Sequence, residues 1–244
     1  MRNDKWTPEN LSKTQEKALE SNDFCELESY GDFGSYRRVL LGDDLKDSLL
    51  GLHNSLKPGP KVNFYHGLLN RRADQISNIL DVGCGMGYTA KELARLYKNA
   101  NVVAVDISSD AIKYGTKKFP EVNFLCQKIE PQNRTIGQFD IIFASEFYPF
   151  TRTSDSNIHL SYIKYLLSQL NPDGHLLWGQ KESIFSTISS IKKELPEFKF
   201  SIHRVPNGKL YRIFRIPFLS VVFDSLVRLL LRRAPEKGIV ISRN

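Results

Sequence analysis

The sequence has little cysteine and shows no spacing typical of metal ligands. Its 244 residues include three cysteines, Cys25, Cys84 and Cys126, whose positions fit neither a disulfide framework nor a zinc site. No cluster of Asp, His or Glu has ligand spacing either, so we expect no metal. The polar N-terminus shows no secretory signal. These absences favour a globular protein of the cytoplasm, where thiols stay reduced.

Acidic residues are scarce in one region, the C-terminal tail. The whole chain carries a formal net charge of +7. Residues 205–244 hold eight Lys or Arg and only two acids, a net charge of +6, so the rest is near neutral. A protein that grips nucleic acid over a broad face would not confine its positive charge to one tail. The charge distribution therefore argues against a nucleic-acid partner.

An acid followed by three alternating glycines is the most informative motif. The apolar run at 78–82 contains Asp81, and Gly83, Gly85 and Gly87 follow before a helical pattern begins. This order predicts a strand, a tight turn and a helix, where the backbone can approach a ligand closely. No Gly-Lys-Ser/Thr follows, which excludes a P-loop. The motif therefore predicts a ligand site of another kind.

The third glycine of a dinucleotide fingerprint is also missing, because its position holds Tyr88. A carboxylate beside the turn would repel a pyrophosphate. Asp81 instead suits a ligand with a cationic group, such as an amino acid ammonium.

Strand and helix patterns alternate through the middle of the chain. The expected strands cover 78–82, 102–105, 122–126, 139–145, 175–179, 198–205 and 238–242. The expected helices cover 88–98, 110–118 with Ser108 or Ser109 as cap, 158–170 and 183–195. Such alternation predicts an α/β fold with a doubly wound parallel sheet and helices on both faces.

The second expected strand ends in another acid, Asp106. An acid at this place in a doubly wound sheet can accept both hydroxyls of a ribose. The alternative interpretation is that Asp106 caps the helix that follows. Asp81, the glycines and Asp106 together resemble the cofactor site of the class I S-adenosylmethionine-dependent methyltransferases. The resemblance covers residues 76–180.

That resemblance implies a Rossmann-like sheet of seven strands in the order 3-2-1-4-5-7-6, with the last strand antiparallel. It implies S-adenosylmethionine as cofactor and S-adenosylhomocysteine as product. Asp81 would face the methionine ammonium, Asp106 the ribose and Ile107 the adenine. Further cofactor contacts are expected from Gly83, Cys84, Gly85, Gly87 and Ser145.

One position departs from the family. An acid near the end of the third strand often binds the adenine amino group, but this chain has Lys128 there. We expect Gln127, the Ile129 backbone or Glu130 to replace it, with Lys128 in the same segment.

The acceptor side is less defined by the sequence. Ligands bind beyond the carboxyl ends of the strands, which places Glu146, Tyr148 and Arg152 near the acceptor. Glu146 is the first candidate for a general base, and His66 and His159 are alternatives. Tyr30 and Tyr36, from an aromatic cluster near the N-terminus, are further candidates for substrate binding.

Four segments follow from this interpretation. Residues 1–75 would form a helical lid, 76–205 the cofactor-binding core, 206–237 an insertion and 238–244 the last strand. The insertion carries a basic amphipathic helix that is too short and too charged to span a bilayer. Residues 210–233 would pack on the sheet, form a homodimer contact or lie peripherally on a membrane.

The predicted function is methyl transfer to an oxygen or nitrogen of a small-molecule acceptor, which could be amphiphilic. One alternative is methylation of RNA or protein, and another is a non-catalytic protein that binds S-adenosylmethionine or acts as a scaffold, because fold does not dictate activity.

Overall fold

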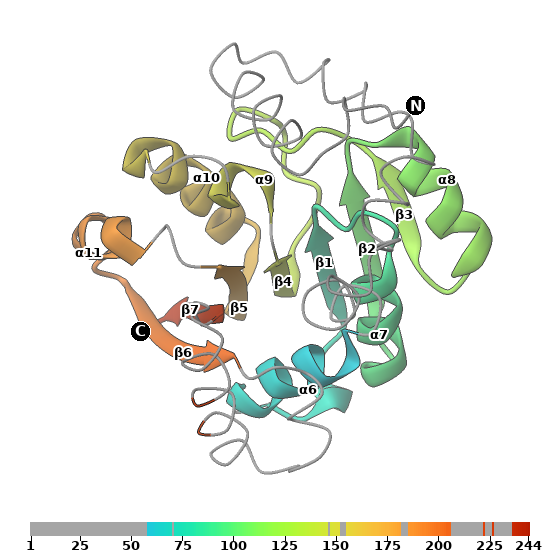
Figure 1. The fold of residues 1–244 in the computed structure, drawn as a ribbon, viewed down its shortest axis with the longest axis horizontal. Coiled ribbons are helices and arrows are strands. Elements are labelled where there is room, and N and C mark those ends of the chain that lie inside the picture. Colours follow the sequence, from blue (N-terminus) through green and yellow to red (C-terminus); the bar gives the residue numbers. More distant parts are fainter. Residues whose placement is uncertain are drawn as a thin grey trace.

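A seven-stranded mixed sheet organises the chain (Figure 1). The computed structural model describes residues 58–69, 71–145, 147–151, 155–181, 185–205, 222, 226 and 236–244. The strands are β1 (Asn78–Val82), β2 (Asn101–Asp106), β3 (Asn123–Cys126), β4 (Phe139–Ser145), β5 (Leu170–Lys181), β6 (Phe198–Val205) and β7 (Glu236–Arg243). Their spatial order is β3-β2-β1-β4-β5-β7-β6, which confirms the predicted order.

The strands pair in the directions that the resemblance implied. β3, β2, β1, β4 and β5 are parallel, while β7 runs antiparallel to both β5 and β6. The carboxyl ends of the parallel strands therefore meet at one edge of the sheet. The glycine turn follows β1 at this edge, and Ser145 ends β4 beside it. The fold thus brings the predicted ligand motif and the end of β4 together.

Helices cover both faces of the sheet. They are α6 (Gly59–Leu68), α7 (Tyr88–Leu96), α8 (Ser109–Lys118), α9 (Tyr148–Thr151), α10 (Ser156–Ser168) and α11 (Phe185–Glu194), with a short 3-10 turn η3 (Ala73–Gln75). Residues of α6, α7 and α8 share one apolar cluster, and residues of α9, α10 and α11 share the other. Figure 1 shows α7 and α8 on the side of the sheet opposite α10 and α11.

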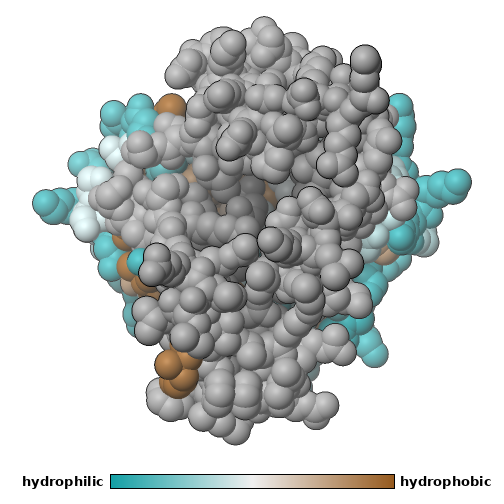
Figure 2. Space-filling model, viewed as in Figure 1, coloured by the Kyte–Doolittle hydropathy of each residue, from teal (hydrophilic) through white to brown (hydrophobic). Residues whose placement is uncertain are grey.

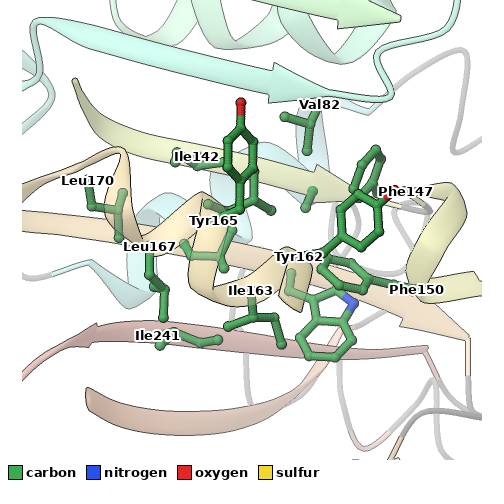
Figure 3. Close-up of a cluster of buried hydrophobic side chains, with 14 of the residues drawn as sticks. Val82, Ile142, Phe147, Phe150, Tyr162, Ile163, Tyr165, Leu167, Leu170 and Ile241 are labelled. Carbon is green, nitrogen blue, oxygen red and sulfur yellow. The ribbon is translucent and has the colours of Figure 1, made fainter. Parts of the chain in front are cut away.

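The second cluster is rich in aromatic side chains. Phe147, Phe150 and Tyr162 gather where α9 and α10 meet the sheet (Figure 3). The ring of Phe147 lies edge-on to those of Phe150 and Tyr162, at centroid distances of 5.5 and 5.8 Å. Edge-to-face pairs of this kind add to the stabilisation that comes from burying the rings. This packing fixes the backbone that follows β4, next to the glycine turn.

Several element boundaries differ from those predicted. Ser108 caps α8, since its hydroxyl accepts a hydrogen bond from the Ala111 amide at 3.3 Å. Asp155 caps α10 in the same way, so that helix begins at Ser156 and ends before Leu170. β5 begins at Leu170 because a register shift lets Leu170 pair with Phe139. The sequence pattern alone did not show this irregularity.

α6 begins within the Pro-Gly-Pro sequence at 58–60. Pro60 lies in the first turn of α6, where its missing N–H costs no hydrogen bond. Val62, Phe64 and Tyr65 of α6 are buried against the sheet. Residues 1–57 of the predicted lid, including Tyr30 and Tyr36, lie outside the described residues. Within the described part of the chain, no helix is long and apolar enough to cross a bilayer.

Candidate cofactor site

The glycine turn is held to β2 by backbone hydrogen bonds. The amides of Gly83 and Cys84 both donate to the Val105 carbonyl, at 2.8 and 3.1 Å. Gly83, Gly85 and Gly87 have φ angles of +68°, +51° and +81°. Side chains with a Cβ rarely adopt this left-handed region. The three glycines are therefore required by the course of the backbone.

The glycines differ in what surrounds them. A Cβ on Gly85 would meet no atom within 4 Å, so this position faces open space. A Cβ on Gly87 would collide with the ring of Phe124, and one on Gly83 would lie 3.0 Å from the ring of Phe147. Gly87 thus serves helix and strand packing. Gly85 is the glycine whose backbone a ligand can approach.

Asp106 ties the turn to the end of β2. Its carboxylate accepts hydrogen bonds from the amides of Gly85, at 2.8 Å, and Ser108, at 2.9 Å. Burial raises the pKa of Asp106, and the amides of Ser108, Gly85 and Ile107 oppose that rise. Ser108, not Asp106, caps α8. A carboxylate offers about four lone-pair positions, so two amides leave acceptor capacity for a ligand.

Asp81 is a buried acid whose hydrogen bonding is incomplete. It is only 2% exposed, and its Oδ2 atom is buried without a hydrogen-bond partner. Burial, followed by the charge of the neighbouring Asp106, raises the pKa of Asp81 to about 8, although the Ala90 amide and Lys61 act to lower it. A buried carboxylate with one oxygen left without a partner is disfavoured as an anion. Its missing partner is a cation or a hydrogen-bond donor.

Lys61 reaches this edge from α6. Its Nζ donates to the Ser145 hydroxyl at 2.7 Å, and its charge lowers the pKa of Asp81. Lys61 is not among the site residues predicted from the sequence. The usable signal was Pro60, which is typical of a first helical turn and places Lys61 within it.

Cys84 lies in the turn as a small buried side chain. Burial raises the pKa of its thiol well above the usual value, and the charges of Asp106 and Asp81 act in the same direction. The thiol therefore stays protonated at neutral pH. Cys84 therefore contributes to the turn through the packing of its side chain and the position of its backbone.

The segment after β3 carries an ion pair at the position that departs from the family. Lys128 Nζ lies 2.5 Å from Glu130 Oε1, and both side chains are partly buried. Ile129 is buried in the core, Gln127 is exposed, and the Gln127 amide donates to the Asp106 carbonyl at 3.0 Å. The Ile107 carbonyl, next to Asp106, lies 3.6 Å from Cys126 Sγ. This segment therefore runs directly beside Asp106.

The two histidines are not brought to the glycine turn. His66 Nδ1 is 3.0 Å from the Tyr97 hydroxyl, at the far end of α7. The nine residues of α7 lie between Gly87 and Tyr97, and the ten steps from one to the other rise about 15 Å. His159 is fully buried in α10 against the rings of Phe150 and Trp178. Glu146, Arg152 and the Tyr148 side chain lie outside the described residues.

The opposite edge of the sheet has a second buried acid. Asp140, at the start of β4, accepts hydrogen bonds from the amides of Ser77 and Asn78 at 2.7 and 3.0 Å, and from Asn171 Nδ2 at 2.9 Å. Arg71 Nη1 lies 3.7 Å from Asp140 Oδ1. Burial would raise the pKa of Asp140, but these donors and the Arg71 charge outweigh it and lower the pKa. Asp140 is therefore a satisfied structural acid.

A cavity of about 510 Å³ opens at that same edge, lined by residues that include Arg71, Asp173, His175 and Arg243. It lies at the amino ends of the strands, away from the glycine turn. Ligands of open α/β sheets bind at the carboxyl ends. Among the described residues, no group of three or more His, Cys, Asp or Glu could hold a metal ion.

Comparison with known proteins agrees with this geometry. Residues 79–174 match the profile of a family described as a methyltransferase domain. The malonyl-[acyl-carrier protein] O-methyltransferase of Priestia megaterium is 31% identical over 147 residues, which are 56% of this chain and 52% of that protein. The trans-aconitate 2-methyltransferase of Afipia carboxidovorans is 23% identical over 151 residues, or 61% of this chain and 55% of that protein.

The chain spans about half the length of these curated relatives. Among solved structures, the plantazolicin methyltransferase BpumL in complex with SAH has a TM-score of 0.56 at 15% identity and covers 96% of both chains, a likeness of fold. The family match and the relatives, together with the sheet order and the site at its carboxyl edge, show that residues 79–174 belong to a methyltransferase domain of the class I S-adenosylmethionine-dependent type.

Proposed function

We propose that the chain transfers a methyl group from S-adenosylmethionine to an oxygen or nitrogen of a small-molecule acceptor. The observation that carries this proposal is the unpartnered, buried Oδ2 of Asp81 beside the open backbone of Gly85. The ammonium of a bound methionine group would supply the missing partner. Relatives that are methyltransferases by name support the same activity.

The described residues fit the cofactor in three places. Asp81 would hold the ammonium, the backbone from Gly83 to Gly85 would line the methionine and ribose, and Asp106 would accept the ribose hydroxyls. Asp106 already positions Gly85 through a 2.8 Å hydrogen bond. Ser145, at the end of β4, would complete the wall opposite the turn. Gly87 would act through packing against Phe124.

The adenine would lie along the segment after β3. Ile107 would contact one face of the ring, and the polar edge would meet Gln127, the Ile129 backbone or Glu130. The ion pair with Lys128 fixes the Glu130 carboxylate in this segment. It thereby supports Glu130 as a replacement for the acid usual in the family.

Catalysis would rest mainly on positioning. When bound, S-adenosylmethionine supplies a methyl group on a sulfonium, which is a good leaving group. The chain then has to hold the acceptor atom in line with that methyl group and exclude water. A general base is needed only where the acceptor must lose a proton. Glu146, next to Ser145, is the proposed base, because His66 and His159 lie elsewhere in the fold.

The relatives suggest the class of acceptor. Malonyl and trans-aconitate, the acceptors in the relatives' names, both carry carboxyl groups. A carboxylate is already deprotonated at neutral pH and would need no base. We therefore propose that an oxygen acceptor, a carboxylic acid first of all, is methylated. Tyr148 and Arg152 would contact it.

The test is a transfer assay with the full chain. It would use S-adenosylmethionine labelled in the methyl group and a panel of acids that includes trans-aconitate and a malonyl thioester. The proposal expects labelled methyl ester with the wild type and at least tenfold less with Asp81→Asn, which loses a charge-assisted hydrogen bond of about 1.5–3 kcal/mol. If the label appeared in RNA or protein instead, the acceptor would be that macromolecule and not a small molecule. The absence of both cofactor binding and transfer would contradict the function itself.

We also propose that the protein is cytoplasmic and that residues 210–233 make a peripheral contact with a membrane. Among the described residues, Ile202, Val222 and Leu226 are the exposed large apolar side chains. The visible described surface is otherwise mainly hydrophilic (Figure 2). Sedimentation with anionic liposomes, compared between the full chain and a variant lacking 210–233, tests membrane contact. Equal sedimentation would leave a homodimer contact, which light scattering would measure.

A further inference from the structure

Lys61 lies at the carboxyl edge of the sheet and is not part of the glycine motif. Its Nζ donates to Ser145 Oγ at 2.7 Å, across 84 residues of sequence. The end of its side chain also lies over Gly179 of β5, since a Cβ there would be 3.3 Å from Lys61 Cε and 3.4 Å from Nζ. The ammonium is therefore placed above the ends of β4 and β5.

The position of Lys61 is fixed by Tyr65, one turn further along α6. The Tyr65 ring is fully buried and lies edge-on to Phe143 at a centroid distance of 5.3 Å. Its hydroxyl donates to the Trp178 carbonyl at 3.4 Å. Residues four apart share one face of a helix, so Lys61 faces the sheet as Tyr65 does.

The sheet makes room for this tyrosine. Gly179 of β5 and Gly238 of β7 pair across the two strands. A Cβ on Gly179 would lie 2.8 Å from the Tyr65 hydroxyl, and one on Gly238 would collide with it. Two glycines thus accommodate one hydroxyl. This arrangement anchors α6 and holds its lysine at the site.

The charge of Lys61 acts on Asp81. It lowers the pKa of a carboxylate that burial and Asp106 raise. β1 and β4 are neighbours, with Asp81 opposite Phe143 and Ser145 two residues further along. An acid from β1 and a cation from α6 therefore both lie near the end of β4. Such a pair complements a ligand that carries an ammonium and a carboxylate.

We propose that Lys61 docks a carboxylate at this edge of the sheet, with the Ser145 hydroxyl orienting its ammonium. The inference rests on the proposed function and names a binding residue for it. The carboxylate has two sources, the methionine part of the cofactor or an acidic acceptor. Both would bind the same ammonium through a charge-assisted hydrogen bond.

Three variants separate this role from simple attachment of α6. Lys61→Gln removes the charge but keeps a donor for Ser145. Ser145→Ala keeps the charge and removes the hydrogen bond. Lys164→Gln removes a charge from an exposed position on α10, on the other face of the sheet, and controls for net charge. If Lys61 only anchored α6, Lys61→Gln would leave ligand affinity unchanged.

Calorimetry on the full chain distinguishes the two sources. The probes are S-adenosylhomocysteine, its decarboxylated analogue, and trans-aconitate added to protein saturated with S-adenosylhomocysteine. A cofactor carboxylate predicts that Lys61→Gln weakens S-adenosylhomocysteine about tenfold more than it weakens the decarboxylated analogue, a charged contact being worth about 1.5–3 kcal/mol. An acceptor carboxylate predicts a similar loss for trans-aconitate alone. Lys164→Gln should change neither.

Two results would overturn the inference in different ways. If the wild type binds S-adenosylhomocysteine and Lys61→Gln binds every probe equally well, or no probe shows a loss confined to its carboxylate, Lys61 does not dock a carboxylate while the proposed function stands. If the wild type does not bind S-adenosylhomocysteine at all, the proposed function fails and the inference fails with it.

Discussion

Asp81 and Asp140 are both buried acids on neighbouring strands, yet they lie at opposite ends of the sheet and in opposite states. Asp140 accepts three hydrogen bonds and has an arginine nearby, and its pKa is lowered. Asp81 has a buried oxygen without a partner, and its pKa is raised to about 8. The fold supplies hydrogen-bond partners for the carboxylate of Asp140 but leaves one oxygen of Asp81 without a partner.

The difference separates an acid that stabilises the fold from one that we propose to bind a ligand. A buried carboxylate with full hydrogen bonding joins the segments that donate to it, here the approach to β1 and the start of β5. A buried carboxylate without partners destabilises the folded state unless something binds it. Perturbed acids at the ligand edge of a fold are typical of functional sites.

Removal of Asp140 should have the largest effect. Asp140→Ala leaves the amides of Ser77 and Asn78 without their acceptor and should lower the free energy of unfolding by about 3 kcal/mol. Urea denaturation at pH 7 measures this. Because the pKa of Asp140 is lowered, its contribution should be present above pH 4 and shrink as the pH falls below that. Unchanged stability would mean that Asp140 is not a structural acid.

Within the glycine turn, Gly87 and Gly85 give a second contrast. Gly87→Ala combines a positive φ with a collision against Phe124 and should cost about 2–3 kcal/mol of unfolding free energy. Gly85→Ala meets open space, so only the backbone term of about 1 kcal/mol applies. Thermal denaturation of the two variants compares them. Gly85→Ala should instead weaken S-adenosylhomocysteine, and equal stability losses would contradict the contrast.

Asp81→Asn should not lower the stability of the folded state at pH 8, in contrast to Asp140→Ala. The pKa of Asp81 is raised, so its contribution to stability is present below about pH 4 and is lost as the pH rises toward 8. The neutral amide should therefore leave the folded state as stable at pH 8 as the wild type, or more stable. Its affinity for S-adenosylhomocysteine at pH 8 should fall about tenfold to a hundredfold. Denaturation and calorimetry give the two values, and a loss of stability without a loss of affinity would reverse the assignment.

From the sequence alone, the carboxyl edge of the sheet could be predicted better than the other parts of the molecule. Asp81, the glycines and Asp106 lie in two short segments whose spacing is constrained by one turn, so their relation could be predicted locally. The strand order came with the family resemblance. The distinct roles of Gly85 and Gly87 could not be predicted, because they depend on Phe124, which approaches from another strand.

Contacts between distant segments explain what the sequence did not show. Lys61 meets Ser145 across 84 residues, and Asp140 meets the amides of Ser77 and Asn78 across more than 60. No period or motif encodes such pairs. His66 was a candidate base because of its residue type, whereas the structure places it against Tyr97 at the far end of α7. Side-chain chemistry indicated the candidates, and packing decided where they lie.

The most direct test of the account is the number of protons released when S-adenosylhomocysteine binds at pH 7. With a pKa of about 8, Asp81 is mainly protonated before binding and must ionise to pair with the ligand ammonium. Calorimetry in two buffers of different ionisation enthalpy should show release of about one proton, tighter binding as the pH rises from 6 to 8, and no release with Asp81→Asn. Binding without proton release, or with equal release by the variant, would contradict the claim that Asp81 holds the cofactor's ammonium.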